Sequence, residues 1–136
     1  MTTNSTADVL SQLSAQAQLR RTTIMTNAAK FALGQVVATP GALDLLQKHG
    51  FSAAQLLARH VTGDWGDLCA EDRAMNEQAL RDGSRIFSVY RLVNADGLAN
   101  IPRNKRDRCP TVWVITDAAN DAGVRAVTTM LRSKDY

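Results

Sequence analysis

The sequence TVWVITDAANDAGVRAVTTML, residues 111–131, carries the clearest structural pattern of the chain. Both of its ends are rich in β-branched residues, which favour extended structure, and they predict strands over residues 111–116 and 124–131. The segment between them, DAANDAG at residues 117–123, consists of residues that favour turns. Two strands joined by such a turn predict an antiparallel β-hairpin.

A third strand is expected upstream of this hairpin. Residues 85–93, RIFSVYRLV, are again rich in aromatic and β-branched side chains. Their connection to the hairpin, residues 94–110, is long and polar and contains glycine and proline. The C-terminal part of the chain is therefore predicted to form a three-stranded antiparallel meander.

Helical signals precede these strands. Residues 40–49 begin with proline and are followed by Gly50, a pattern typical of the start and the end of a helix. A capping-box sequence at Ser52 predicts a second helix that runs to about His60. Residues 70–81 predict a third helix, because glycine follows them and acids occupy their first turn. The residues of this third helix that we expect to face the core are Ala74, Met75 and Ala79.

With 136 residues, the chain has the length of one domain. Because helices precede the strands, we predict an α+β fold in which short helices pack on one face of the three-stranded antiparallel β-meander. This domain is expected over residues 32–136, with residues 35–39 as a short extended segment. Residues 1–31 are predicted to be a helical or partly disordered N-terminal extension, whose helix spans residues 7–19.

The formal net charge of +3 hides an uneven distribution. Residues 1–43 carry +2, residues 44–82 carry −3 and residues 83–136 carry +4. A net positive chain of this kind is not an acidic mimic of DNA. Four of the nine bases in the last block fall within residues 103–108, and these are Arg103, Lys105, Arg106 and Arg108.

These four residues, which we call the basic arm, are a candidate binding site for a nucleic acid or another partner. Lysine and bidentate arginine bind phosphate groups, and contacts of this type weaken with salt. The alternative is a solvated loop that protects a sheet edge from aggregation. No aromatic residue is interleaved with these bases, so the pattern gives no support for base stacking.

A second candidate is the loop motif at residues 63–67, GDWGD. Its glycines permit positive φ angles, and we expect Trp65 to fold back over the core. Asp64 and Asp67 lie on either side of this tryptophan. Their carboxylates do not follow the order of an EF-hand, and no metal site is predicted.

The histidine just before this loop is a candidate general acid or base. In that interpretation Asp64 or Asp67 orients His60, and Arg91 and Thr128 from the predicted strands join it. The alternative is that His60 serves as a helix cap or ion-pair partner without any catalytic role.

No cofactor is expected, because the chain has no glycine-rich phosphate loop, no GxSxG and no HExxH. Cys69 and Cys109 are isolated, as in proteins of a reducing compartment, and the spacing of the histidines does not suit a zinc finger. The N-terminus lacks the pattern of a secretory signal, and no apolar run is long enough for a membrane helix. We therefore expect a cytoplasmic protein that does not contact a membrane.

Several segments carry a family resemblance, and they are LGQVVATPGAL (33–43), RH (59–60), GDWGDL (63–68), GSRIFSVY (83–90), VWVITD (112–117) and TTML (128–131). Over residues 32–136 the chain resembles a bacterial family of plasmid-related proteins, which are carried on mobile genetic elements and are also labelled as type I restriction-modification subunits. GDWGDL and WVIT are the most specific parts of the likeness. Residues 94–110 are longer and more basic than the family pattern, and residues 1–31 are an addition to it.

The resemblance implies a mobile-element setting rather than an activity. A methyltransferase subunit is excluded, because the chain is too short for that fold and lacks the glycine-rich loop that would hold the cofactor. The first hypothesis is a non-enzymatic accessory protein of a mobile element, which binds a protein or a nucleic acid and counters a host defence system. Its contact surfaces would be the basic arm and the extension.

The second hypothesis is a small metal-independent ribonuclease, because helices followed by an antiparallel sheet are the layout of RelE- and barnase-like toxins. In that case His60 is the acid or base, while Arg91 and Thr128 stabilise the charge of the phosphate. Fold analogy of this kind is a weak argument for function. The sequence leaves open whether the protein is a homodimer.

Overall fold

The computed structural model describes residues 29–136, so the helix predicted over residues 7–19 lies outside the described part. In chain order the elements are β1 (Gln35–Ala38), α3 (Pro40–His49), α4 (Ala53–Val61), α5 (Ala70–Asp82), β2 (Ile86–Arg91), α6 (Ala95–Ala99), the 3₁₀ helix η1 (Arg103–Arg108), β3 (Thr111–Thr116), β4 (Val127–Leu131) and the 3₁₀ turn η2 (Ser133–Asp135). The predicted α+β class is confirmed.

The sheet has four strands in the order β1-β4-β3-β2. Strands β2, β3 and β4 form the predicted antiparallel meander, in which Phe87 lies opposite Ile115 and Ile115 lies opposite Thr129. The prediction of only three strands is wrong, because β1 pairs in parallel with β4 and places Val37 opposite Thr129. The extended segment predicted over residues 35–39 is confirmed as β1, and it joins the sheet because β4 offers it an edge.

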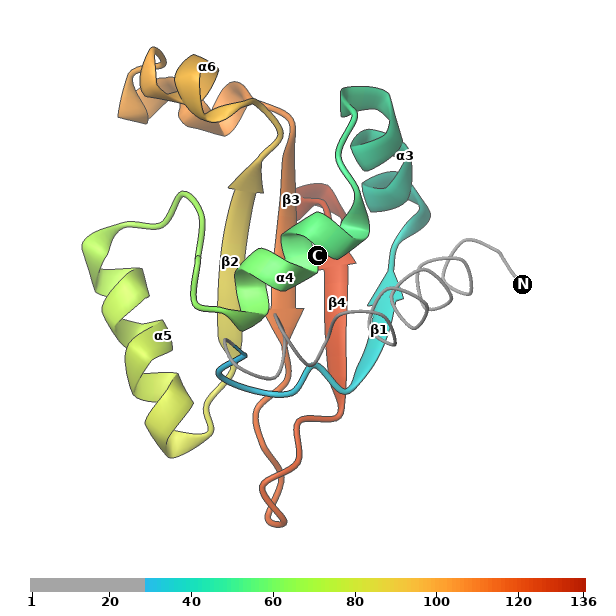
Figure 1. The fold of residues 1–136 in the computed structure, drawn as a ribbon, viewed down its shortest axis with the longest axis vertical. Helices are drawn as coiled ribbons and strands as arrows, with labels where there is room; N and C mark the ends of the chain where they lie inside the picture. Colours follow the sequence, from blue (N-terminus) through green and yellow to red (C-terminus); the bar gives the residue numbers. More distant parts are fainter. Residues whose placement is uncertain (1–28) are drawn as a thin grey trace.

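Helices α3 and α4 cover one face of the sheet, and α5 lies beside the outer edge of β2 (Figure 1). The predicted caps are present, since Ser52 Oγ accepts a hydrogen bond from Gln55 N at 3.1 Å and Gln55 Oε1 accepts one from Ser52 N at 2.8 Å. The core under these helices is a cluster of buried side chains that includes Val36, Leu46, Leu56, Leu57, Tyr90, Val112, Val114 and Met130.

The inward face of α5 differs from the prediction. Ala74 and Met75 are exposed, whereas Asn76 is buried together with Ala79. Asn76 Nδ2 donates to the carbonyl oxygen of Phe87 at 2.7 Å, and Asn76 Oδ1 accepts from the nitrogen of Phe87 at 3.1 Å. A polar residue faces inward because it satisfies the backbone of an edge strand, which an apolar side chain cannot do.

The predicted final strand starts three residues too early, because the chain before Val127 is held by Arg125. This side chain is 9% exposed and donates to the carbonyl oxygens of Ser84 at 2.6 Å, Asp117 at 3.0 Å and Ala79 at 2.9 Å. It therefore ties the β3–β4 connection to the end of α5. In Figure 1 that connection projects from the end of the sheet opposite α6 and η1.

Candidate functional site

The loop motif runs along the outer edge of β2. The nitrogen of Val89 donates to the carbonyl oxygen of Trp65 at 3.1 Å, and the nitrogen of Asp67 donates to the carbonyl oxygen of Val89 at 2.7 Å. Gly66 lies between them with a φ of 77°, and a Cβ at this position would collide with the carbonyl oxygen of Val89. The sequence thus needs glycine here for both its backbone angle and its close approach to the strand.

Trp65 is the anchor of this loop, as predicted. Its side chain is 2% exposed, and its Nε1 donates to Glu77 Oε2 on α5 at 2.9 Å. The indole packs beside the ring of His60 with 6.0 Å between ring centroids. Burial of a tryptophan whose N–H has a partner fixes the position of the adjacent carboxylates.

Asp67 joins the loop to the basic arm. Its side chain is 7% exposed and accepts hydrogen bonds from Arg91 Nε at 2.9 Å and from Arg106 Nη1 at 3.2 Å. Arg103 Nη1 lies 3.9 Å from the same carboxylate. Burial raises the pKa of Asp67, but the hydrogen bonds from these guanidinium groups outweigh it and hold the pKa below its usual range.

Two more arginines bind the same loop. Arg59 Nε pairs with Asp64 Oδ2 at 2.7 Å, and Arg73 donates to the carbonyl oxygens of Gly66 at 2.7 Å and Leu68 at 3.0 Å. Arg103 also donates to the carbonyl oxygen of Leu68 at 3.0 Å. The five guanidinium groups that converge on this loop form what we call the arginine cluster, Arg59, Arg73, Arg91, Arg103 and Arg106.

The arginine cluster carries excess positive charge. Its five guanidinium groups face only two carboxylates, Asp64 and Asp67. The balance stays positive when Lys105 and Arg108 of η1 and the neighbouring acids are included, because seven bases then meet six acids. The four added acids are Glu71, Asp72, Glu77 and Asp107.

The basic arm is divided between two environments. Arg106 has a side chain that is only 19% exposed, and that of Arg103 is 60% exposed. Lys105 and Arg108 are exposed, and within residues 29–136 they form no ion pair or side-chain hydrogen bond. Arg103 and Arg106 therefore hold the arm against the loop, whereas the charges of Lys105 and Arg108 face solvent.

His60 is fully buried and contacts neither aspartate. Its Nδ1 lies 2.6 Å from Ser88 Oγ, and its Nε2 lies 2.9 Å from Thr116 Oγ1. The predicted orientation of His60 by Asp64 or Asp67 is wrong, because these carboxylates pair with the arginine cluster instead. The imidazole points under the helices, whereas the carboxylates lie at the sheet edge.

The hydrogen bonds around His60 fix its tautomer. Thr128 Oγ1 donates its one proton to the carbonyl oxygen of Leu33 at 2.7 Å, so it must accept from Thr116 Oγ1, which lies 2.7 Å away. The proton of Thr116 is then used, and its oxygen accepts from Nε2–H of His60. Nδ1 is left as the acceptor for the hydroxyl of Ser88. His60 and Thr128 therefore belong to one buried network, and Arg91 belongs to the arginine cluster.

Burial lowers the pKa of His60 to about 3. Phe31 packs against the imidazole with its ring centroid 5.2 Å away. A neutral ring that is 0% exposed and has both nitrogens in hydrogen bonds cannot reach a substrate from this position. Through these hydrogen bonds the network connects α4 to β2, β3, β4 and the segment before β1.

This burial predicts an acid-sensitive fold. The folded-state pKa of about 3 lies below the ordinary 6.5, so the unfolded chain binds more protons between these values. The contribution of His60 to the free energy of unfolding is fully present above about pH 6.5. It is expected to fall by about 2–3 kcal/mol when the pH is lowered to about 4.5. Urea unfolding at each pH measures this loss, and a flat profile over the interval would contradict a buried neutral imidazole. Asp64 and Asp67, with lowered pKa values, contribute only at more acidic pH.

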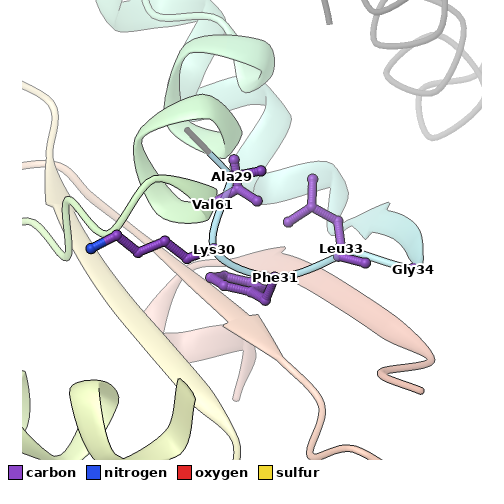
Figure 2. A pocket seen from close by; sticks show the side chains of 7 residues that line it. Ala29, Lys30, Phe31, Leu33, Gly34 and Val61 are labelled. Carbon is purple, nitrogen blue, oxygen red and sulfur yellow. The ribbon is translucent and has the colours of Figure 1, made fainter. Parts of the chain in front are cut away.

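A pocket of about 460 Å³ lies on the helix-covered side, between residues 29–34 and Val61 (Figure 2). Its lining is mostly apolar, and the amine of Lys30 points away from Leu33 and Val61. The pocket does not include any residue of the arginine cluster, and it touches the buried network of His60 only at Leu33, whose carbonyl oxygen accepts from Thr128.

Within the described residues, no helix combines the length and apolar character needed to cross a membrane. In the same part of the chain, no three His, Cys, Asp or Glu side chains gather as metal ligands would. Comparison with models of protein families, with curated proteins and with solved structures finds no match for the chain.

Proposed function

We propose that the protein is a non-enzymatic accessory protein of a mobile genetic element and that it binds nucleic acid through the arginine cluster and η1. The observation that supports this most strongly is the convergence of five arginines on a loop with only two carboxylates. Arg73 donates to two neutral carbonyl oxygens, which orient its guanidinium group without cancelling its charge, and Arg103 donates to the carbonyl oxygen of Leu68 while lying 3.9 Å from Asp67.

Phosphate is the ligand chemistry that suits this surface. Arginine presents a planar set of donors that matches phosphate oxygens, and Lys105 and Arg108 add charge beside it. Because the arm is fixed by Asp67, its exposed bases are held in place before a ligand arrives. A polyanion whose phosphates repeat at regular spacing can contact several of these groups at once.

The mobile-element setting and a role against host defence rest on the family resemblance of GDWGDL and WVIT. The genes beside this one provide the direct observation, since a cluster of anti-defence genes would support that role. A protein partner with an acidic surface is the competing outcome of the binding experiment below.

The ribonuclease hypothesis has less support. Its proposed acid or base, His60, is buried, and both of its ring nitrogens are hydrogen-bonded. Arg91 binds Asp67 at the sheet edge instead of lying beside His60. Cleavage of total RNA by the purified protein would restore that hypothesis against this geometry.

Removing the exposed charges of the arm tests the proposed function. The variant Lys105→Gln/Arg108→Gln is expected to bind a mixed-sequence oligonucleotide of about 20 nucleotides about tenfold more weakly at low salt, with a smaller dependence on salt. Fluorescence anisotropy over a series of salt concentrations measures both quantities. Both side chains are exposed, and within residues 29–136 neither forms an ion pair or a side-chain hydrogen bond, so stability should not change.

The matched control is Lys48→Gln/Arg81→Gln, which removes the same charge from the ends of α3 and α5. We expect this control to lose much less affinity. If both double variants weaken binding equally, the effect reflects net charge alone and the proposed surface is wrong. If the protein binds no oligonucleotide but captures an acidic protein through the arm, the nucleic-acid function is wrong.

A further inference from the structure

The face of the sheet opposite α3 and α4 carries the side chains that alternate with the core. In the strand register, Phe87 shares a row with Ile115 and Thr129, and Trp113 shares the next row with Val89 and Leu131. Among the described elements, helices α3 and α4 lie on the other face (Figure 1). This opposite face carries strand side chains, and towards the β2 edge Phe87 and Trp113 pack against a cluster that includes Val89, Trp65 and Ala79 of α5.

Three aromatic rings form a stripe on this face, and we call Phe87, Trp113 and Tyr136 the aromatic stripe. The ring centroids of Phe87 and Trp113 are 5.2 Å apart, and those of Trp113 and Tyr136 are 5.8 Å apart. Tyr136 is 72% exposed. Because β2, β3 and the C-terminus each supply one ring, the stripe crosses neighbouring segments of the fold.

The aliphatic residues of the same face are already shielded. Val89 and Leu131 are each 6% exposed and Ile115 is 9% exposed, whereas Phe87 and Trp113 are only partly buried. A second copy of the chain packing sheet to sheet would gain little aliphatic burial here. The groups left for a partner are aromatic rings with threonine hydroxyls beside them, which suits stacking better than a dry interface.

Cationic groups lie at both ends of the stripe. Arg85 Nη1 donates to Tyr136 Oη at 3.0 Å. At the other end Arg91 pairs in register with Thr111 and donates to Thr111 Oγ1 at 2.9 Å, one row beyond Trp113. Because Arg91 also binds Asp67, the stripe is continuous with the arginine cluster.

We propose that the aromatic stripe stacks the bases of a single-stranded nucleic acid whose phosphates run towards the arginine cluster. This inference rests on the proposed function and names its substrate class. Aromatic side chains on an open sheet face stack unpaired bases irrespective of sequence, while bases in a duplex are already stacked on each other. The sequence of the basic arm contains no aromatic residue, and the stripe supplies aromatic rings from β2, β3 and the C-terminus.

Binding of oligo(dT), oligo(U) and a mixed-sequence duplex, each of about 20 nucleotides or base pairs, tests the inference on the full chain. We expect both single strands to bind more tightly than the duplex. Tyr136→Ala should weaken single-strand binding by about tenfold and leave duplex binding nearly unchanged. Tyr136→Phe, which keeps the ring and loses only the hydroxyl, is the matched control and should bind like the original chain.

Tryptophan fluorescence adds a readout of direct contact. Trp65 is 2% exposed and packs beside His60, whereas Trp113 is only partly buried, so quenching by oligo(dT) should come from Trp113. The variant Trp113→Phe should keep a stacking ring and lose the quenching. Quenching that persists in this variant would contradict stacking on the stripe.

The outcomes separate this inference from the proposed function. Equal affinity for single strand and duplex, with both weakened by Lys105→Gln/Arg108→Gln and neither by Tyr136→Ala, overturns the stripe and keeps the arginine cluster. A dimer in sedimentation that dissociates with Tyr136→Ala assigns the stripe to a second copy and also overturns it. Binding to none of the three probes overturns both proposals.

Discussion

Gly66→Ala is expected to lower the free energy of unfolding by about 3–4 kcal/mol. The new Cβ would collide with the carbonyl oxygen of Val89, which is backbone of a sheet strand and cannot move aside. The loop would have to leave the edge of β2 and lose both of its hydrogen bonds to Val89. Chemical denaturation of the purified variant measures the loss.

Gly50→Ala is the matched control for this substitution. Gly50 has a similar φ of 73°, but an added Cβ would meet nothing within 4 Å. Its cost is therefore limited to the backbone angle, about 1 kcal/mol. If both variants lose the same stability, the close approach of the loop to β2 does not contribute, and the edge contact described above is wrong. Displacement of the loop should also move Asp67 and weaken nucleic-acid binding.

The second large effect is expected at His60. His60→Ala should lower the free energy of unfolding by about 4 kcal/mol, because it opens a cavity and leaves buried hydroxyl groups without partners. Ser88 and Thr116, both 0% exposed, lose the two hydrogen bonds that the imidazole makes with them. Thermal or urea unfolding at neutral pH measures the change.

His49→Ala provides the comparison, since His49 is exposed in the last turn of α3. Its loss should change stability by less than about 0.5 kcal/mol. A His60→Ala variant as stable as His49→Ala would mean that the buried network does not hold the sheet to α4. A variant that stays folded and keeps its affinity for oligonucleotides would agree with a purely structural role for His60.

The elements that could be predicted from the sequence are those whose signals are local. The capping box at Ser52 and the proline and glycine around residues 40–49 identified two helices, and residues 111–116 gave a strand with the right bounds. The extended segment over residues 35–39 was predicted, but its role as a fourth strand was not, because this depends on pairing with β4, which lies more than 80 residues later. Asn76 is similar, since its burial depends on the backbone of Phe87.

The candidate site could be predicted in part. Composition alone identified the basic arm, but its attachment to Asp67 joins two loops that are 39 residues apart and leaves no pattern in either. His60 was paired with the wrong residues because it is near Asp64 in sequence, although the two side chains end up in different environments. The aromatic stripe was missed because its members are spread over β2, β3 and the C-terminus.

The saturated edge of β2 has a consequence for self-association. Asn76 and the loop motif occupy the outward backbone groups of Phe87 and Val89, so no further strand can add at this side of the sheet. Growth by strand addition would have to begin at β1, the opposite end of the order β1-β4-β3-β2. Two copies joined there by a twofold axis would turn both blocked edges outward. Such an assembly would end at a pair, because neither blocked edge could add a third copy.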